Sequence, residues 1–239
     1  MDSPKPCMNC GRPLPPAVRY CGDCGQDHRY PRLKLRELAF DAAGELFAFD
    51  RPWFATLRGL FPEPGTMARG YVEGARVGLV GPVRFLLTLL AVQFVVLQAA
   101  AIWLGGQAPI HSGWLSAGLL GLSVPLAAGL RLFCQARERD LAEAIVFACY
   151  AMGAVTLFFA AWFGCLRTFL FWADSHGWHS GIALFPPVTL AILGIVLPLY
   201  WATGARRFFG CSWWLALLAS YVACVAGLIG VASLIHVTS

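Results

Sequence analysis

The chain has 239 residues, of which 58% are hydrophobic and 13% charged, and its formal net charge is +5. Soluble domains usually have about a quarter of their residues charged, so this composition excludes an ordinary soluble globular protein and favours a membrane protein. Twelve of the 18 Lys and Arg residues lie at or before Arg84, beside the first long apolar run, which favours contact with anionic lipid headgroups over contact with nucleic acid.

Two Cys-x-x-Cys-Gly motifs, CMNCG and CGDCG, stand within residues 1–28. Four thiolates complete a tetrahedral ligand set for Zn²⁺ and leave no position for water; here they come from Cys7, Cys10, Cys21 and Cys24. So short a segment cannot fold on apolar burial alone, so the metal must supply folding energy. A redox dithiol, the alternative, needs one such motif in a βαβ context, which is missing. We therefore predict a structural zinc ribbon over residues 1–28, with His28 as a surface residue.

The other five of the nine cysteines are scattered through apolar segments, so we expect no secreted disulfide framework. The first 30 residues are polar and lack an apolar core of the kind that signal peptides have. We therefore expect the N-terminus to stay in the cytoplasm.

Residues 29–82 mix charged and aromatic side chains and favour amphipathic interfacial helices. Apolar residues recur at helical spacing between Leu33 and Phe49, with charged residues on the other side. Pro52 begins a second short helix with an apolar stripe, and residues 62–65 end it. We expect both helices to lie in the headgroup plane. The alternative is a small cytosolic subdomain, for which this segment offers little core.

Residues 83–239 contain five apolar segments, each near the ~20 residues that a helix needs to cross the hydrocarbon core. They span residues 83–104, 114–133, 143–166, 184–203 and 212–236. With the N-terminus inside, every Lys and Arg except Arg167 falls on the cytoplasmic side, as the positive-inside rule requires. The predicted fold class is therefore an all-α membrane protein with five transmembrane helices, and its C-terminus lies outside.

Arginines precede the first apolar segment at Arg69, Arg76 and Arg84, with Tyr71 among them. We expect these four residues to contact lipid headgroups, since Arg binds phosphate and Tyr favours the interface. The alternative is that the arginines are ordinary anchors whose side chains reach toward water.

The pattern PG-x₅-Y-x₂-G-x-R-x₅-P-x₂-F, together with tandem motifs ending in CGQ, resembles domain of unknown function family 3667. The matching positions are Cys7, Cys10, Cys21, Cys24, Gly25, Gln26, Pro64, Gly65, Tyr71, Gly74, Arg76, Pro82 and Phe85. The resemblance implies a bacterial multi-pass protein with an N-terminal zinc ribbon, and hence the inner (plasma) membrane. It implies no mechanism.

The apolar segments offer little chemistry. Gln93 and Gln98 are polar, but no carboxylate lies deep in a segment, as an ion-coupled carrier usually needs. Prolines in the second and fourth segments leave open a broken helix that binds a solute. Small residues in the fifth segment favour close helix packing, either within the monomer or in a homo-oligomer.

An outer-face metal site is a further possibility, because imidazole and carboxylate ligands gather there at His111, Asp174, His176 and His179. An enzyme with its site at the outer face would need His176 or His179, since no nucleophile elbow, P-loop or HExxH motif is present, and the sequence favours a non-enzyme. We expect an adaptor or regulator whose ribbon docks a cytosolic protein, in contact with membrane lipids and not nucleic acid. The alternative is a transporter of small solutes or lipids.

Overall fold

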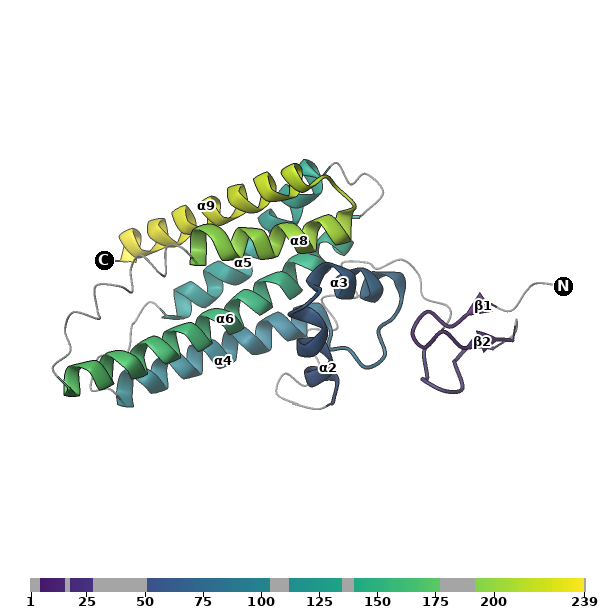
Figure 1. The fold of residues 1–239 in the computed structure, drawn as a ribbon, viewed down its shortest axis with the longest axis horizontal. Coiled ribbons are helices and arrows are strands. Elements are labelled where there is room, and N and C mark those ends of the chain that lie inside the picture. Colours follow the sequence, from purple (N-terminus) through teal and green to yellow (C-terminus); the bar gives the residue numbers. More distant parts are fainter. Residues whose placement is uncertain are drawn as a thin grey trace.

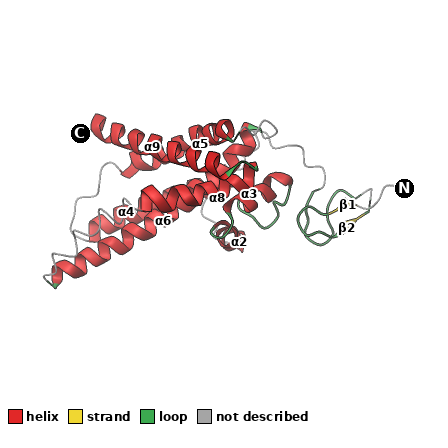
Figure 2. Cartoon of the chain, turned by 45° about the horizontal axis from the view of Figure 1, so that its top comes forward, coloured by secondary structure: helices red, strands yellow, loops and turns green. Residues whose placement is uncertain are grey.

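The computed structural model describes residues 5–15, 18–27, 51–103, 112–134, 140–176 and 192–238. A small ribbon precedes a body that is predominantly helical in the described ranges (Figure 1, Figure 2). The predicted amphipathic helix between Leu33 and Phe49, and His28, lie outside the described residues.

The ribbon repeats one backbone motif twice. In each half a Cys amide donates to a carbonyl five residues on, from Cys7 to Arg12 (2.7 Å) and from Cys21 to Gln26 (2.8 Å). Gly11 and Gly25 follow the second Cys of each motif with φ of 77° and 74°, a conformation that only Gly adopts readily. Strands β1 (Lys5–Pro6) and β2 (Pro13–Leu14) pair antiparallel beside the first motif.

Two short helices follow. The first, α2 (Arg51–Leu60), has the predicted Pro52 in its first turn. The second is α3 (Pro64–Glu73). The sequence pattern does not predict it, because Pro and Gly at residues 62–65 indicate the end of the preceding helix. Its start has a physical reason, since Pro64 fits the first turn, where its missing amide costs no hydrogen bond. Gly74 ends α3 with φ of 116°.

The apolar segments form the predicted long helices with altered ends. They are α4 (Pro82–Trp103), α5 (Ser112–Phe133), α6 (Leu141–Ser175), the π-helical turn η2 (Ile192–Val196), α8 (Leu197–Phe209) and α9 (Trp213–Thr238). Helix α6 runs past the expected end at residue 166, because no Gly or Pro pair interrupts it before His176. Helix α8 runs past residue 203 because Arg206 and Arg207 suit a helix C-terminus, and Gly210 caps it. The first part of the fourth predicted segment lies outside the described residues.

The long helices lie side by side, with α6 against α4 and α5, and α9 against α5 and α8 (Figure 1). Cys134 after α5 and Cys211 before α9 form a disulfide, with their Cα atoms 5.1 Å apart. No disulfide had been assigned to the scattered cysteines, and sequence spacing could not reveal this pair, because the two residues are 77 positions apart. The pairing places the end of α5 beside the α8–α9 turn.

Helices α2 and α3 share the core of the long helices. Trp53 and Tyr71 are only 2% and 7% exposed, within the same buried cluster as Phe85 and Tyr150. The rings of Trp53 and Phe85 lie 5.1 Å apart, and those of Phe85 and Tyr150 lie 5.7 Å apart. Helices α2 and α3 therefore pack onto the end of the helical bundle and have no separate core of their own, whereas their expected place in the headgroup plane stays a prediction.

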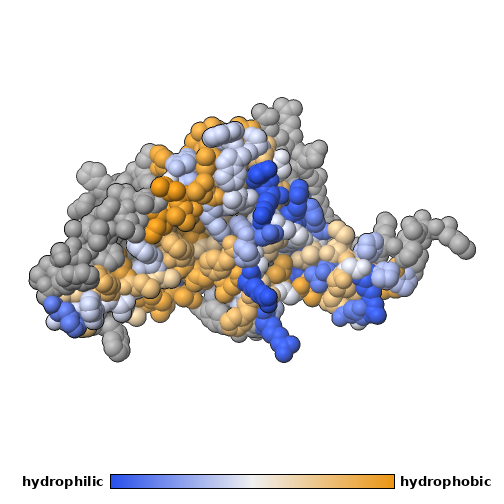
Figure 3. All heavy atoms as spheres, in the orientation of Figure 1, coloured by the Kyte–Doolittle hydropathy of each residue, from blue (hydrophilic) through white to orange (hydrophobic). Residues whose placement is uncertain are grey.

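Two helices of the described residues are long and apolar enough to cross a membrane. These stretches are Pro82–Ala99 in α4 and Leu141–Ala173 in α6, and the described parts of α5 and α9 hold shorter apolar runs. Figure 3 shows hydrophobic residues over much of the bundle surface, with a hydrophilic band near the end that α2 and α3 cover. Several large apolar side chains are exposed on the bundle: Phe94, Val95, Leu132, Phe171 and Trp214.

Candidate metal centre

The four predicted cysteine ligands come together. The sulfur atoms of Cys7 and Cys24 lie 3.6 Å apart, as do those of Cys10 and Cys21. All four lie within 4.8 Å of one another. Four sulfurs at about 2.3 Å from one Zn²⁺ would lie about 3.8 Å apart, so the cluster is compatible with a tetrahedral metal. The distances are far longer than the ~2.05 Å of a disulfide bond.

Backbone amides of the motifs favour the thiolate form that a metal requires. The Cys10 amide, followed by the Asn9 amide, hydrogen-bonds the Cys7 sulfur and lowers its pKa. The Cys24 amide lowers the pKa of Cys21 to about 7 in the same way. The Arg12 amide acts likewise on Cys10, but burial and the neighbouring thiols outweigh it and raise the pKa of Cys10 to about 11. Thiolates bind metal, so one ligand in each motif is prepared for it.

The site is closed toward solvent on one side. Cys7 and Cys21 are each 2% exposed and form a small core with Leu14. Four thiolates fill a tetrahedral sphere, and a filled sphere has no position for a substrate or a reactive water. The cluster therefore suits a structural metal that shapes the ribbon.

Two ribbon arginines are engaged within the ribbon. Arg12 pairs with Asp23, and the Arg19 Nε donates to Asp27 at 3.3 Å. The Arg19 guanidinium also lies over the Tyr20 ring, 4.9 Å from its centre. These carboxylates offset the positive charge that a nucleic acid would require.

The four residues expected at lipid headgroups have different surroundings. Tyr71 departs from the expectation, because it is buried edge-on against Tyr150, with ring centres 5.9 Å apart. Arg76 lies against Tyr71, because the Arg76 Nε donates to the Tyr71 carbonyl at 3.2 Å. Arg69 is exposed on α3, and its Nε lies 3.4 Å from Glu73. Arg84 is half-buried in the first turn of α4.

Sequence reasoning missed a clamp on the loop before α4. The Val80 amide donates to the Thr56 hydroxyl at 2.9 Å, and the Val80 carbonyl accepts from the Tyr150 hydroxyl at 2.5 Å. The Thr156 hydroxyl donates within its own helix, to the Met152 carbonyl at 2.9 Å. The burial of Thr56 is visible only in the structure, so no sequence pattern could have revealed this clamp.

The candidate outer-face site is described only at His176. Its ring stacks on Trp172 with centres 4.6 Å apart, and its Nδ1 lies 3.0 Å from the Ser175 hydroxyl. His111 and His179 lie outside the described residues, as does the side chain of Asp174.

Comparison with known proteins gives one match. Residues 50–94 match the family model described as protein of unknown function (DUF3667). The family resemblance is therefore confirmed over this segment. No curated protein and no solved structure matches the chain.

The matched DUF3667 segment holds α2, α3 and the start of α4, and its motif residues have packing roles. Gly65 lies where any side chain would overlap the Gly204 carbonyl oxygen of α8. Gly74 has the positive φ that ends α3, and Pro82 begins α4. Phe85 is fully buried between Trp53 and Tyr150. In this chain, these motif residues therefore hold α2, α3 and the start of α4 within the helical bundle.

Proposed function

We propose that the chain is a multi-pass inner-membrane protein whose cytosolic zinc ribbon docks a protein partner, so that it serves as an adaptor or regulator and not as an enzyme. The observation that carries the proposal is the ribbon itself. A closed four-cysteine cluster fixes a surface on which Val18 and Tyr20 are 41% and 50% exposed. Exposed apolar surface marks protein interaction sites when it is contiguous, so Val18 and Tyr20 are where we expect the partner to bind.

Five spans are the membrane arrangement that we propose. Helices α4 and α5 have 22 residues each and α9 has 26, enough for about 33 Å or more at 1.5 Å per residue. Helix α6, with 35 residues, lies among them, and α8 with η2 supplies the remaining span. Arg131 near the end of α5, and Arg206 and Arg207 near the end of α8, support a cytoplasmic location for that end.

The ribbon belongs on the proposed cytoplasmic side of the bundle. Met8 lies next to Gly74 at the end of α3, where an added Cβ would be 3.7 Å from the Met8 Cβ. Met8 is nevertheless 60% exposed, so this contact leaves most of its side chain accessible. The ribbon thus stands beside the bundle and retains open surface for another protein.

The proposal is tested by quantitative affinity capture from intact membranes. Val18→Ser plus Tyr20→Ser alters the ribbon surface and leaves all four cysteines in place. Cys7→Ser plus Cys10→Ser removes two ligands. The matched control is Phe61→Ser plus Val77→Ser, because these side chains are 50% and 40% exposed outside the ribbon.

We expect one cytosolic protein to be retained by the wild type and the control, and lost by both ribbon variants at equal membrane insertion. Capture of the same proteins by all four chains would reject the ribbon as the docking module. If the partner is lost by both ribbon variants, the adaptor role further requires that the purified partner binds the purified chain directly.

A transporter is the second candidate, favoured by the break in helix geometry at η2 and by Gln93, which is 2% exposed within α4. Broken helices bind solutes through freed backbone groups. Here the Tyr221 hydroxyl of α9 already donates to the Gly194 carbonyl at 2.6 Å, so packing accounts for one such group. Solute uptake into proteoliposomes that contain only this protein would favour the transporter.

A further inference from the structure

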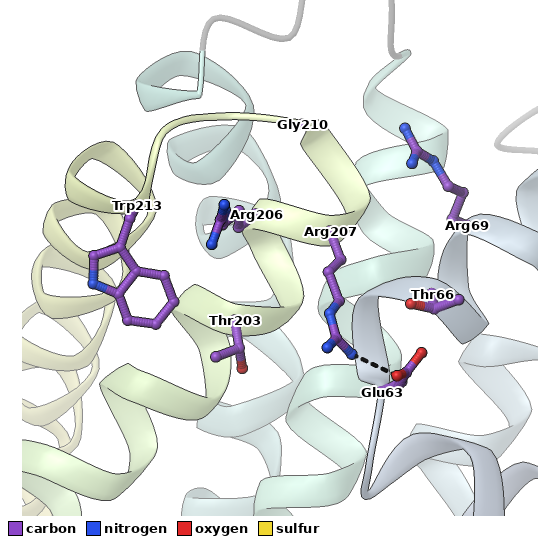
Figure 4. Close-up of a pocket in the computed structure, with 8 residues that line it drawn as sticks. All are labelled: Glu63, Thr66, Arg69, Thr203, Arg206, Arg207, Gly210 and Trp213. Atoms are coloured by element: carbon purple, nitrogen blue, oxygen red, sulfur yellow. Dashed lines mark ion pairs between the residues drawn. The ribbon is translucent and has the colours of Figure 1, made fainter.

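A cavity of about 680 Å³ opens between α3, the end of α8 and the start of α9 (Figure 4). Its size lies in the range of small-molecule sites. The cavity is lined by Glu63, Thr66, Arg69, Thr203, Arg206, Arg207, Gly210 and Trp213. We call it the arginine pocket, because three of these side chains are guanidinium groups from two helices.

The pocket has a positive balance, with three arginines against one carboxylate. Arg207 lies 3.0 Å from Glu63, and both side chains are about half exposed, at 48% and 51%. Exposed ion pairs of this kind contribute little to stability, so an anion can compete with Glu63 for the guanidinium. Arg206 makes no ion pair with any described residue, and in Figure 4 it lies between Trp213 and Arg207.

Arg69 adds a third guanidinium from α3. Its ion pair with Glu73 is the pairing of two exposed residues one helical turn apart, which is also weak. Glu73 does not line the cavity. If the Arg69 side chain turns toward an anion in the pocket, the Glu73 carboxylate therefore does not enter the pocket with it.

The two walls of the pocket are held rigidly together. Gly65 of α3 packs against the backbone of Gly204 in α8 so closely that no side chain fits. The Tyr200 hydroxyl donates to the Leu60 carbonyl at 3.0 Å and ties α8 to the end of α2. The backbones that carry the arginines are therefore fixed relative to each other before any ligand arrives, and only the arginine side chains have to turn toward the anion.

We propose that the arginine pocket binds the phosphate group of an anionic phosphate ester. Guanidinium groups match phosphate oxygens with paired hydrogen bonds, and the Thr66 hydroxyl can add a neutral donor. Trp213 has the amphipathic ring that suits the level where headgroups meet acyl chains. The phosphate could belong to a lipid headgroup or to a soluble ester. The lipid source rests on the proposed membrane orientation, whereas the phosphate chemistry does not.

The site differs from the set expected from sequence. Arg76 is held on Tyr71 and does not line the cavity, and Arg84 does not line it either. The pocket replaces them with Arg206 and Arg207, which lie more than 120 residues further along the chain and meet Arg69 only through the packing of α3 on α8.

Two probes distinguish the phosphate sources on the purified full chain. Native mass spectrometry measures retention of phosphatidylglycerol against phosphatidylcholine, and calorimetry in detergent measures binding of glycerol 3-phosphate. The test variant is Arg69→Gln plus Arg206→Gln. Arg58→Gln is the matched control, because Arg58 is an exposed arginine of α2 outside the pocket. Glu63→Gln is a third variant that removes the repulsive carboxylate.

We expect the double variant to weaken binding of at least one probe by about tenfold or more, since each substitution removes hydrogen bonds from a charged donor to the phosphate. Arg58→Gln should stay within about twofold, and Glu63→Gln should bind more tightly. Retention of phosphatidylglycerol alone assigns the lipid source, and binding of glycerol 3-phosphate assigns a soluble ester. The proposal is overturned if neither probe binds the wild type, or if Arg58→Gln weakens binding as much as the double variant. Loss of the ribbon partner has no bearing on this result, because the ribbon does not line the pocket.

Discussion

At the residue scale, the molecule depends on a few side chains that satisfy backbone groups in the loop before α4. Tyr150 and Thr56 bond the two backbone groups of Val80 from different helices. Tyr150→Phe removes the bond to the Val80 carbonyl and leaves that buried oxygen without this donor. We expect a loss of about 1–2 kcal/mol in the free energy of unfolding, measured by denaturation in detergent. Tyr20→Phe, an exposed ribbon tyrosine, should leave the bundle's stability unchanged.

The four cysteines give a second prediction at this scale. Purified wild type should contain about one zinc per chain by elemental analysis, and Cys7→Ser should contain almost none. Cys149→Ser, which changes a buried thiol far from the ribbon, should keep its zinc. Equal zinc in wild type and Cys7→Ser would contradict the site.

Acid should release the metal. The pKa of Cys21 is lowered to about 7, so its thiolate is favoured above that pH and lost as the pH falls through it. Protons therefore compete with zinc increasingly below neutral pH, and zinc retention should decline as the pH is lowered and stay complete in mildly alkaline buffer. Zinc content that does not change on acidification would contradict this reasoning.

The cysteines were predictable as a cluster because two short motifs contain all four. The burial of Tyr71 could not be predicted, because sequence shows only an aromatic residue beside basic ones, whereas its packing depends on Tyr150, far along the chain. Arg206 and Arg207 were missed as neighbours of Arg69 for the same reason, since their meeting depends on how α3 crosses α8.

At the scale of elements, glycine spacing decides how α3 meets α8. Gly65→Ala would push a methyl group into the Gly204 carbonyl, and overpacking of this kind costs about 1–3 kcal/mol. Gly70 lies in the same helix with nothing near its Cβ position, so Gly70→Ala should be neutral or stabilising by up to about 1 kcal/mol. Both values come from unfolding curves, and equal effects of the two substitutions would contradict the crossing.

The long helices were predictable because apolar runs of this length have few alternative structures. The ends of these helices were less predictable. Helix α6 does not end at the single Arg within it, and two arginines favour the extension of α8. Helix α3 was missed because Pro and Gly indicate both a turn and a helix start. The η2 turn has no sequence pattern beyond the nearby Pro198.

At the scale of the whole molecule, the features described above lie at one end. The ribbon lies beside the end of α3 through Met8 and Gly74, and α3 and the arginine pocket lie at the end of the bundle where α8 ends (Figure 1). If this end faces the cytoplasm, a docked protein and a bound phosphate ester would meet the same surface. The charge pattern predicted that orientation from sequence, whereas the gathering of the sites depends on tertiary packing.

The odd number of spans is the central claim, because it puts the ribbon and the C-terminus on opposite sides of the membrane, and the charge pattern assigns the ribbon to the cytoplasm. Reporter fusions at both ends of the full chain test it most directly, with one reporter active only in the cytoplasm and one only in the periplasm. We predict that the cytoplasmic reporter is active at the N-terminus and the periplasmic reporter at the C-terminus. Activity of the same reporter at both ends would require an even number of spans and would contradict the account.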